Sequence, residues 1–217
     1  MTDNQHYDAS QIKLLDPIEH IRLRPGMYIG GTDVKALHHL VFEVVHDALQ
    51  EVLAGQADHI TVTLFDDNGV SVSDNGFGLP VDITSWDQIS LAEIVMTNVL
   101  WGKSCFRVDQ PINAGIFGMG LQLVNALCKE AKIEVKRDGY LWEQSYSEGK
   151  RQTDLINVRE LQSHETTGTT LTFKPDFTIF SPNNFSYQTL ARAFRQLAFL
   201  TPNLTITLDD KRSQPEG

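Results

Sequence analysis

The sequence predicts a two-layer α+β sandwich, in which a mixed, mostly antiparallel sheet is covered by helices on one face. Short alternating strands meet at the turn sequences of residues 66–69 and 138–139, which is typical of antiparallel hairpins. Helical segments interrupt these hairpins, whereas a doubly wound parallel sheet requires strands and helices to alternate strictly. The chain has 217 residues, 41% of them hydrophobic, which suffices for a sizeable core.

The first elements are an arm and a short helix. Residues 1–15 are polar with scattered apolar anchors, so we expect an extended arm ahead of a single domain over residues 16–217. Asp16 and Pro17 are typical of an N-cap and a first helical position. The helix that they open ends before the turn sequence of residues 24–26.

Apolar residues at helical spacing predict a long helix over residues 35–54, with Gly55 as its stop. Its apolar stripe contains Leu37, Leu40, Val41, Val44, Ala48 and Val52. Its opposite stripe contains His39, Glu43, His46, Asp47, Gln50 and Glu51, which are surface neighbours because they lie three or four residues apart. We expect this second stripe to be polar and solvated.

Hairpins and helices fill the rest of the chain. We expect strands over residues 60–64, 70–73, 132–136, 140–146, 169–173 and 204–208. We expect helices over residues 90–100, 121–127 and 186–200. The segment up to Asn113 lacks periodicity and is predicted to be a mobile loop, of the kind that often acts as a lid.

Charge and cysteine content exclude several classes of protein. Lys and Arg total 18 against 28 Asp and Glu, and a net charge of −10 argues against autonomous binding to nucleic acid. Cys105 and Cys128 have no metal-like spacing and no secretory context, which indicates reduced thiols and a cytoplasmic protein. No apolar run approaches the roughly 18 residues of a membrane span.

Two glycine motifs together predict a purine pocket with a phosphate cradle. Asp74 ends a strand, where its carboxylate can accept a hydrogen bond from the amino group of a flat ring, and Gly76 and Gly78 allow close approach of the backbone. Gly115, Gly118 and Gly120 lead into a helix, whose free N–H groups and dipole favour an anion. Each motif alone is as easily structural, and the second matches neither a Walker nor a dinucleotide pattern.

Acidic residues on the long helix supply candidate catalytic and metal-binding groups. Glu43 is the candidate general base that orients water for attack on a terminal phosphate, and Asp47, one turn on, is the candidate Mg²⁺ ligand. Lys103 lies in the expected lid, within reach of a γ-phosphate. The alternative is that these residues have no role in a site, because acidic helix faces and loop lysines are ordinarily only solvated.

Several motifs resemble the N-terminal ATPase domain of DNA gyrase and topoisomerase IV B subunits, members of a superfamily shared with MutL, histidine kinases and the heat-shock chaperone. They are RPGMYIG at residues 24–30, FEVV at 42–45, LAG at 53–55, Asp74-x-Gly-x-Gly and VNAL at 124–127. The resemblance runs from about Tyr7 to Arg212 and implies a Bergerat-type ATP-binding fold over residues 16–217, with ATP and Mg²⁺ as cofactors.

The resemblance also implies a role for each site residue. Asp74 takes the adenine amino group with support from Thr169, the glycines at 115, 118 and 120 wrap the triphosphate, and Lys103 belongs to the lid. Glu43 activates water, position 47 binds Mg²⁺, and Arg137 lines the pocket mouth. The arm residues Tyr7 and Ile12 cross to a second copy of the chain when ATP closes the dimer. A gyrase A-like partner and DNA would be reached only through further domains.

Five residues around the pocket depart from the family pattern. Asp47 stands where the family has Asn, His46 replaces an acidic residue, and Phe77 stands where an Arg pairs with the glutamate corresponding to Glu51. Ala114 and Phe117 replace a Gly and a His in the phosphate loop. We therefore expect a weakly hydrolysing ATPase module; the alternatives are a non-catalytic nucleotide sensor and a purely structural partner.

Overall fold

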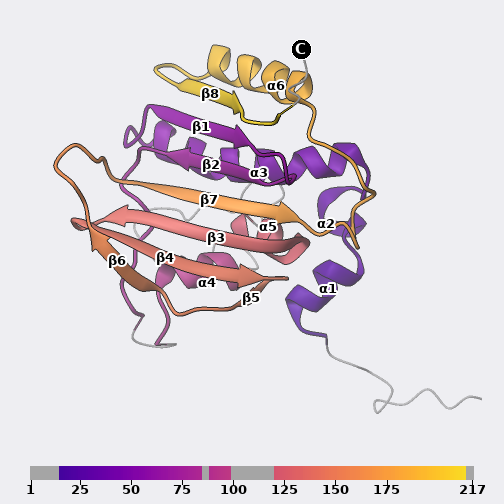
Figure 1. Ribbon diagram of the computed structural model, residues 1–217, viewed down its shortest axis with the longest axis horizontal. Coiled ribbons are helices and arrows are strands. Elements are labelled where there is room, and N and C mark those ends of the chain that lie inside the picture. The colour runs from indigo at the N-terminus through magenta and orange to yellow at the C-terminus, as the bar shows by residue number, and fades with distance from the viewer. Residues whose placement is uncertain (1–14, 85–87, 99–119, 214–217) are drawn as a thin grey trace, which may run out of the picture.

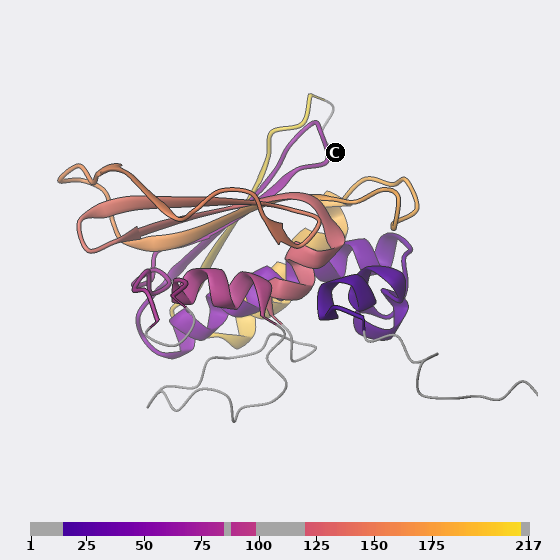
Figure 2. The same cartoon turned by 90° about the horizontal axis from the view of Figure 1, so that it is seen from below.

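The computed structural model describes residues 15–84, 88–98 and 120–213, and it confirms the two-layer α+β sandwich. One layer is a twisted sheet, and the other is a layer of helices packed against a single face of that sheet (Figure 2). The helices are α1 (Pro17–Leu23), α2 (Gly26–Ile29), α3 (Val34–Leu53), α4 (Leu91–Thr97), α5 (Leu121–Leu127) and α6 (Tyr187–Leu200).

The sheet has eight strands within the described ranges, in the order β5-β4-β3-β7-β2-β1-β8, with β6 also paired to β4 (Figure 1). The strands are β1 (His59–Leu64), β2 (Val70–Asp74), β3 (Cys128–Arg137), β4 (Tyr140–Ser147), β5 (Lys150–Arg151), β6 (Ile156–Glu160), β7 (Gly168–Pro175) and β8 (Thr205–Asp210). Only β1 and β8 pair in parallel, so the sheet is mixed and mostly antiparallel as expected.

Helix α3 is the central element of the helical layer, and it packs against β1, β2 and α5. Its start is fixed by Asp33, whose Oδ1 accepts a hydrogen bond from the Ala36 amide at 3.0 Å. The predicted apolar stripe is buried throughout. The opposite stripe is not uniformly solvated, since Glu43 is 0% exposed and Asp47 is half-buried.

Five elements differ from the sequence expectation. The turn expected at residues 24–26 continues into the single helical turn α2, and β5 and β6 were not expected. Helix α4 ends at Thr97 instead of extending to residue 100. Strand β3 begins directly after α5, at Cys128, four residues earlier than predicted, because pairing with β7 extends it.

The core lies between the sheet and the helices. Its fully buried residues include Leu37, Val62, Leu123, Ile133 and Phe173, contributed by α3, β1, α5, β3 and β7. Within the described part of the chain, no helix combines the length and apolar character that crossing a membrane would require.

Candidate functional site

Asp74 lies at the end of β2, on the same side of the strand as the buried residues Val70 and Val72. Its Oδ1 accepts hydrogen bonds from the backbone N–H groups of Gly76 at 2.8 Å and Thr169 at 3.3 Å. Among the described residues Oδ2 accepts no hydrogen bond, and the carboxylate plane is fixed by the two bonds to Oδ1. The site therefore presents one oriented acceptor, as recognition of an amino group on a purine requires.

Backbone contacts around Asp74 explain the glycines. A Cβ at Gly76 would lie 2.9 Å from Oε2 of Glu51, and one at Gly78 would lie 2.9 Å from the Lys136 carbonyl oxygen. At Gly168, where φ is +150°, a Cβ would lie 2.2 Å from the Asp74 carbonyl oxygen. Gly78 and Gly168 are thus required by the close approach of backbone atoms, whereas at Gly76 the nearest atom is the flexible end of the Glu51 side chain.

Arg137 and Thr169 both hold the turn that follows Asp74. The guanidinium of Arg137 donates to the Gly78 carbonyl oxygen at 2.6 Å, and the Thr169 hydroxyl accepts from the Leu79 amide at 3.0 Å. Thr169 therefore contacts the site twice, through its amide on Asp74 and through its hydroxyl on the turn. Both residues therefore lie beside the candidate adenine site.

Three carboxylates of α3 follow one another at four-residue intervals, and the second and third of them, Asp47 and Glu51, lie near Asp74. Glu43 is fully buried, whereas Asp47 and Glu51 are half-buried. Burial raises the pKa of Asp47 to about 7, and the nearby charges of Asp74, Glu51 and Glu43 add to that rise. Burial also raises the pKa of Asp74 to about 6, against the hydrogen bonds from Gly76 and Thr169 that lower it.

This concentration of negative charge suits a bound cation. The ion pairs among the described residues include none to Asp47, Glu51 or Asp74, so no lysine or arginine neutralises them there. The same residues contain no group of three ligands placed to hold a metal by themselves. Mg²⁺ commonly takes one or two carboxylates and completes its shell with waters and phosphate oxygens, so Asp47 fits such a shared site.

Departures from the family pattern are visible at two positions. Phe77 is 59% exposed on the turn after Asp74, and the absence of an ion pair to Glu51 in the described ranges agrees with the loss of an arginine there. His46 is half-buried beside Gln50, and burial lowers its pKa. A neutral imidazole therefore stands next to Asp47 at neutral pH.

Part of the expected site lies outside the described residues. This applies to the phosphate-loop residues Gly115, Gly118, Ala114 and Phe117, to Lys103 in the expected lid, and to the arm residues Tyr7 and Ile12. Gly120 is described: it is the N-terminal flanking residue of α5, with φ at +60°. The seven residues of α5 that follow are all buried.

Sequence reasoning missed the requirement at Gly168. Gly168 directly precedes the predicted site residue Thr169, but only the pairing of β7 with β2 brings Gly168 against Asp74. It also missed the double hydrogen bond of the Asn125 side chain, which donates to the carbonyl oxygens of Met96 and Gly149. Neither contact has a local signal in the sequence.

Comparisons with known proteins identify the family of this chain. A family model described as "Histidine kinase-, DNA gyrase B-, and HSP90-like ATPase" matches residues 32–179. The chain is 42% identical over 214 residues to the DNA gyrase B protein of Haloferax volcanii, covering 98% of this chain and 34% of that protein. It is 39% identical to the gyrase B protein of Clostridium acetobutylicum and 42% identical to that of Thermotoga maritima, covering 32% of each. The chain thus spans about a third of the length of these curated relatives.

Proposed function

The chain belongs to the family of histidine kinase-, DNA gyrase B- and HSP90-like ATPases, and we propose from this premise that it is the ATP-binding and ATP-hydrolysing module of a gyrase B-like topoisomerase subunit. The observation that carries the proposal is the Asp74 carboxylate, held on one oxygen by two backbone amides and open on the other. It faces a helix that carries a fully buried carboxylate, Glu43.

Each residue then has a part in binding or hydrolysis. Asp74 accepts the adenine amino group, with Thr169 and Arg137 holding the turn around it. Glu43 orients and deprotonates the water that attacks the terminal phosphate, which a buried carboxylate on a rigid helix can do. Gly115, Gly118 and Gly120 supply amides to the phosphates, and Lys103 a positive charge.

The proposal also includes binding of Mg²⁺ and pairing of two copies of the chain. Bound Mg²⁺ would neutralise phosphate charge, and Asp47 would hold it through a carboxylate oxygen. ATP would draw two copies together through the arm residues Tyr7 and Ile12 to promote DNA strand passage. DNA and a gyrase A-like partner would bind through further domains, because this chain carries a net charge of −10. We place its action in the cytoplasm.

The non-catalytic sensor is the less favoured function. Glu43 is fully buried on the helix next to Asp74, where a general base is expected, and the relatives named above are gyrase B proteins. Retention of Glu43 therefore favours hydrolysis, even though Asp47, His46 and Phe77 depart from the family pattern.

The proposal is tested by Glu43→Gln, which keeps the size of the side chain and removes its basicity. Calorimetry should show ATP binding within a few-fold of the parent chain, while Mg²⁺-dependent phosphate release should fall by roughly 10²–10⁴-fold. Glu130→Gln is the matched control, because its side chain is 65% exposed on β3 and should leave both quantities unchanged. Unchanged turnover in Glu43→Gln contradicts the mechanism, and failure of the parent chain to bind ATP contradicts the function.

A further inference from the structure

The carboxylate of Glu165 joins three parts of the chain beside the candidate adenine site. Glu165 lies between β6 and β7, three residues before Gly168. Its Oε2 and Oε1 accept hydrogen bonds from the Arg159 guanidinium on β6, at 2.5 and 2.9 Å. Its Oε1 also lies 3.1 Å from Nζ of Lys136 on β3. The segment that leads into β7 is therefore tied to both of these strands.

The contacts of Glu165 are stronger than those of an ordinary surface ion pair. The guanidinium binds both carboxylate oxygens, which makes the attraction directional. The Gln162 amide donates to Oε2 at 3.0 Å, and the Glu165 side chain is only 13% exposed, so solvent screens these contacts less than those of a fully exposed pair. The hydrogen bonds from Arg159 and Gln162 hold the pKa of Glu165 well below its usual range, so the carboxylate is charged at neutral pH.

The start of β7 is the part of the sheet that these contacts restrain. Lys136 is paired with Gly168 in the register of β3 and β7, so the ion pair from Glu165 leads to the strand position opposite the first residue of β7. The pairing of β7 with β2 ends at Thr170, one residue short of Thr169. Segments with fewer such partners open more easily than the centre of a sheet. Glu165 therefore restrains the end of β7 that the pairing with β2 leaves out.

Thr169 connects the start of β7 to Asp74. Its amide donates to Asp74 Oδ1 at 3.3 Å, and its hydroxyl accepts from the Leu79 amide at 3.0 Å. A distance of 3.3 Å is long for an N–H donor, and such a bond weakens steeply as distance and angle change. If the start of β7 shifts away from β2, this bond is lost first. The Asp74 carboxylate would keep the Gly76 amide but lose the second donor that fixes its plane.

We infer that Glu165 is a positioning residue for recognition of the purine amino group: through Arg159 and Lys136 it holds the start of β7, and with it the Thr169 amide that orients Asp74. The inference rests on the proposed function, in which Asp74 accepts the amino group of adenine. It concerns the choice of base and not the hydrolysis of the terminal phosphate.

A pair of ligands that differ only in the amino group tests this role. Purine riboside triphosphate has the ribose and phosphates of ATP but no amino group on its base. In calorimetry with Mg²⁺, the parent chain should prefer ATP by about tenfold or more, as a hydrogen bond to a charged acceptor warrants. In Glu165→Gln this preference should fall by about threefold or more, because ATP loses an oriented acceptor and the analogue loses nothing.

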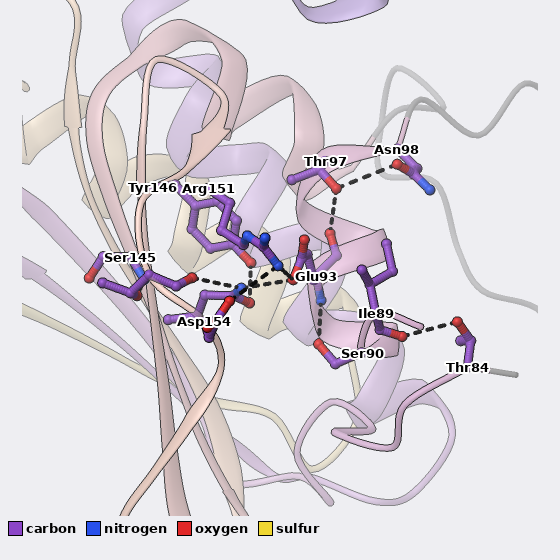
Figure 3. A network of polar contacts seen from close by, with 12 residues as sticks. Thr84, Ile89, Ser90, Glu93, Thr97, Asn98, Ser145, Tyr146, Arg151 and Asp154 are labelled. Atoms are coloured by element: carbon purple, nitrogen blue, oxygen red, sulfur yellow. Dashed lines mark hydrogen bonds and ion pairs between the residues drawn. The ribbon is translucent and has the colours of Figure 1, made fainter. Parts of the chain in front are cut away.

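A second pair of arginine and glutamate provides the matched control (Figure 3). Arg151 of β5 lies 3.3 Å from Oε2 of Glu93 on α4, and its side chain is 45% exposed, against 41% for Arg159. In the sheet, β4 and β3 separate β5 from β7. Arg151→Gln should therefore leave the preference for ATP unchanged. Arg159→Gln should lower it as Glu165→Gln does, and the double variant should lower it no further, because the two residues act through one ion pair.

The outcomes separate the positioning role from the proposed function. Equal losses for ATP and the analogue in Glu165→Gln, an unchanged preference, or an equal fall in Arg151→Gln overturn the positioning role and leave the proposed function intact. A parent chain that binds neither ligand, or binds both equally well, contradicts the function proposed for the Asp74 site itself. If Glu165→Gln does not fold, Arg159→Gln takes the same test with the same two ligands.

Discussion

Asp74 and Asp47 lie near each other in the site, and burial raises the pKa of both. Their expected charge states at neutral pH differ, however. Asp74, with a pKa of about 6, is mainly ionised at neutral pH, and its two backbone donors fix the direction in which it accepts. Asp47, with a pKa of about 7, is close to half-protonated there. A residue in that state can exchange its proton for a metal ion, whereas an oriented acceptor must remain charged or partly charged.

The variant Asp47→Asn tests whether the buried charge of Asp47 destabilises the nucleotide-free chain. The quantity compared is the free energy of unfolding of the variant and the parent chain. A carboxyl group with a raised folded-state pKa binds its proton more tightly folded than unfolded. Its penalty is therefore absent below the unfolded pKa near 4, grows as pH rises, and is complete above about 7. In urea unfolding at about pH 8.5, we expect the variant to be roughly 1–3 kcal/mol more stable than the parent chain.

The advantage of Asp47→Asn should shrink to about a third near pH 5, because the folded parent side chain is then largely protonated. Asp154→Asn is the control, with a side chain 83% exposed, and should change little at either pH. A variant that is less stable than the parent chain at high pH would show that a cation or hydrogen bond already compensates Asp47.

At the scale of elements, long periodic segments were predictable and short ones were not. Helix α3 was expected over residues 35–54 and is Val34–Leu53, because apolar spacing and Asp33 set its limits locally. Strand β6 is exposed at every position and pairs with β4, and the alternation of Ile156 and Val158 with polar residues is too short a signal to distinguish it from a loop. Helix α2 has only four residues, too few for a period.

In the candidate site, too, some features were predictable from the sequence and others were not. Asp74, Gly76, Gly78 and Thr169 were identified from sequence, and the hairpin and the pairing of β7 with β2 bring them together. The burial of Glu43 was not predictable from α3 alone. It depends on the rest of the helical layer, including α5, which comes much later in the chain and packs against α3.

Gly168→Ala tests the close approach of β7 to β2. The new Cβ would lie 2.2 Å from the Asp74 carbonyl oxygen, so either the start of β7 or Asp74 itself must move. We expect a loss of about 2–4 kcal/mol in unfolding free energy and weaker ATP binding by calorimetry. Gly139→Ala is the matched control: its φ is +82°, but nothing lies within 4 Å of the added Cβ, so only backbone strain of roughly 1 kcal/mol applies. Equal losses in the two variants would contradict the close approach.

At the scale of the whole molecule, a negatively charged chain is proposed to bind a negatively charged ligand. The chain carries a net charge of −10, and Glu43, Asp47, Glu51 and Asp74 lie together in the site proposed for ATP. Repulsion between these carboxylates and the phosphates must be offset by a cation for binding to be favourable. Mg²⁺ commonly takes one or two carboxylates and completes its shell with phosphate oxygens, so we expect the cation to bind together with the nucleotide.

Thermal unfolding with separate ligands tests this order of binding. Mg²⁺ alone should change Tm little, and ATP with a chelator should also have a small effect because its charge is unscreened. ATP and Mg²⁺ together, at about 100 times Kd, should stabilise the chain by about 2.7 kcal/mol, or roughly 5–10 °C in Tm. Adenosine is the control, since it carries no phosphate and should raise Tm equally with and without Mg²⁺. An equal shift for ATP with and without Mg²⁺ would mean that groups of the chain itself neutralise the triphosphate, and Asp47 would then not be needed as a metal ligand.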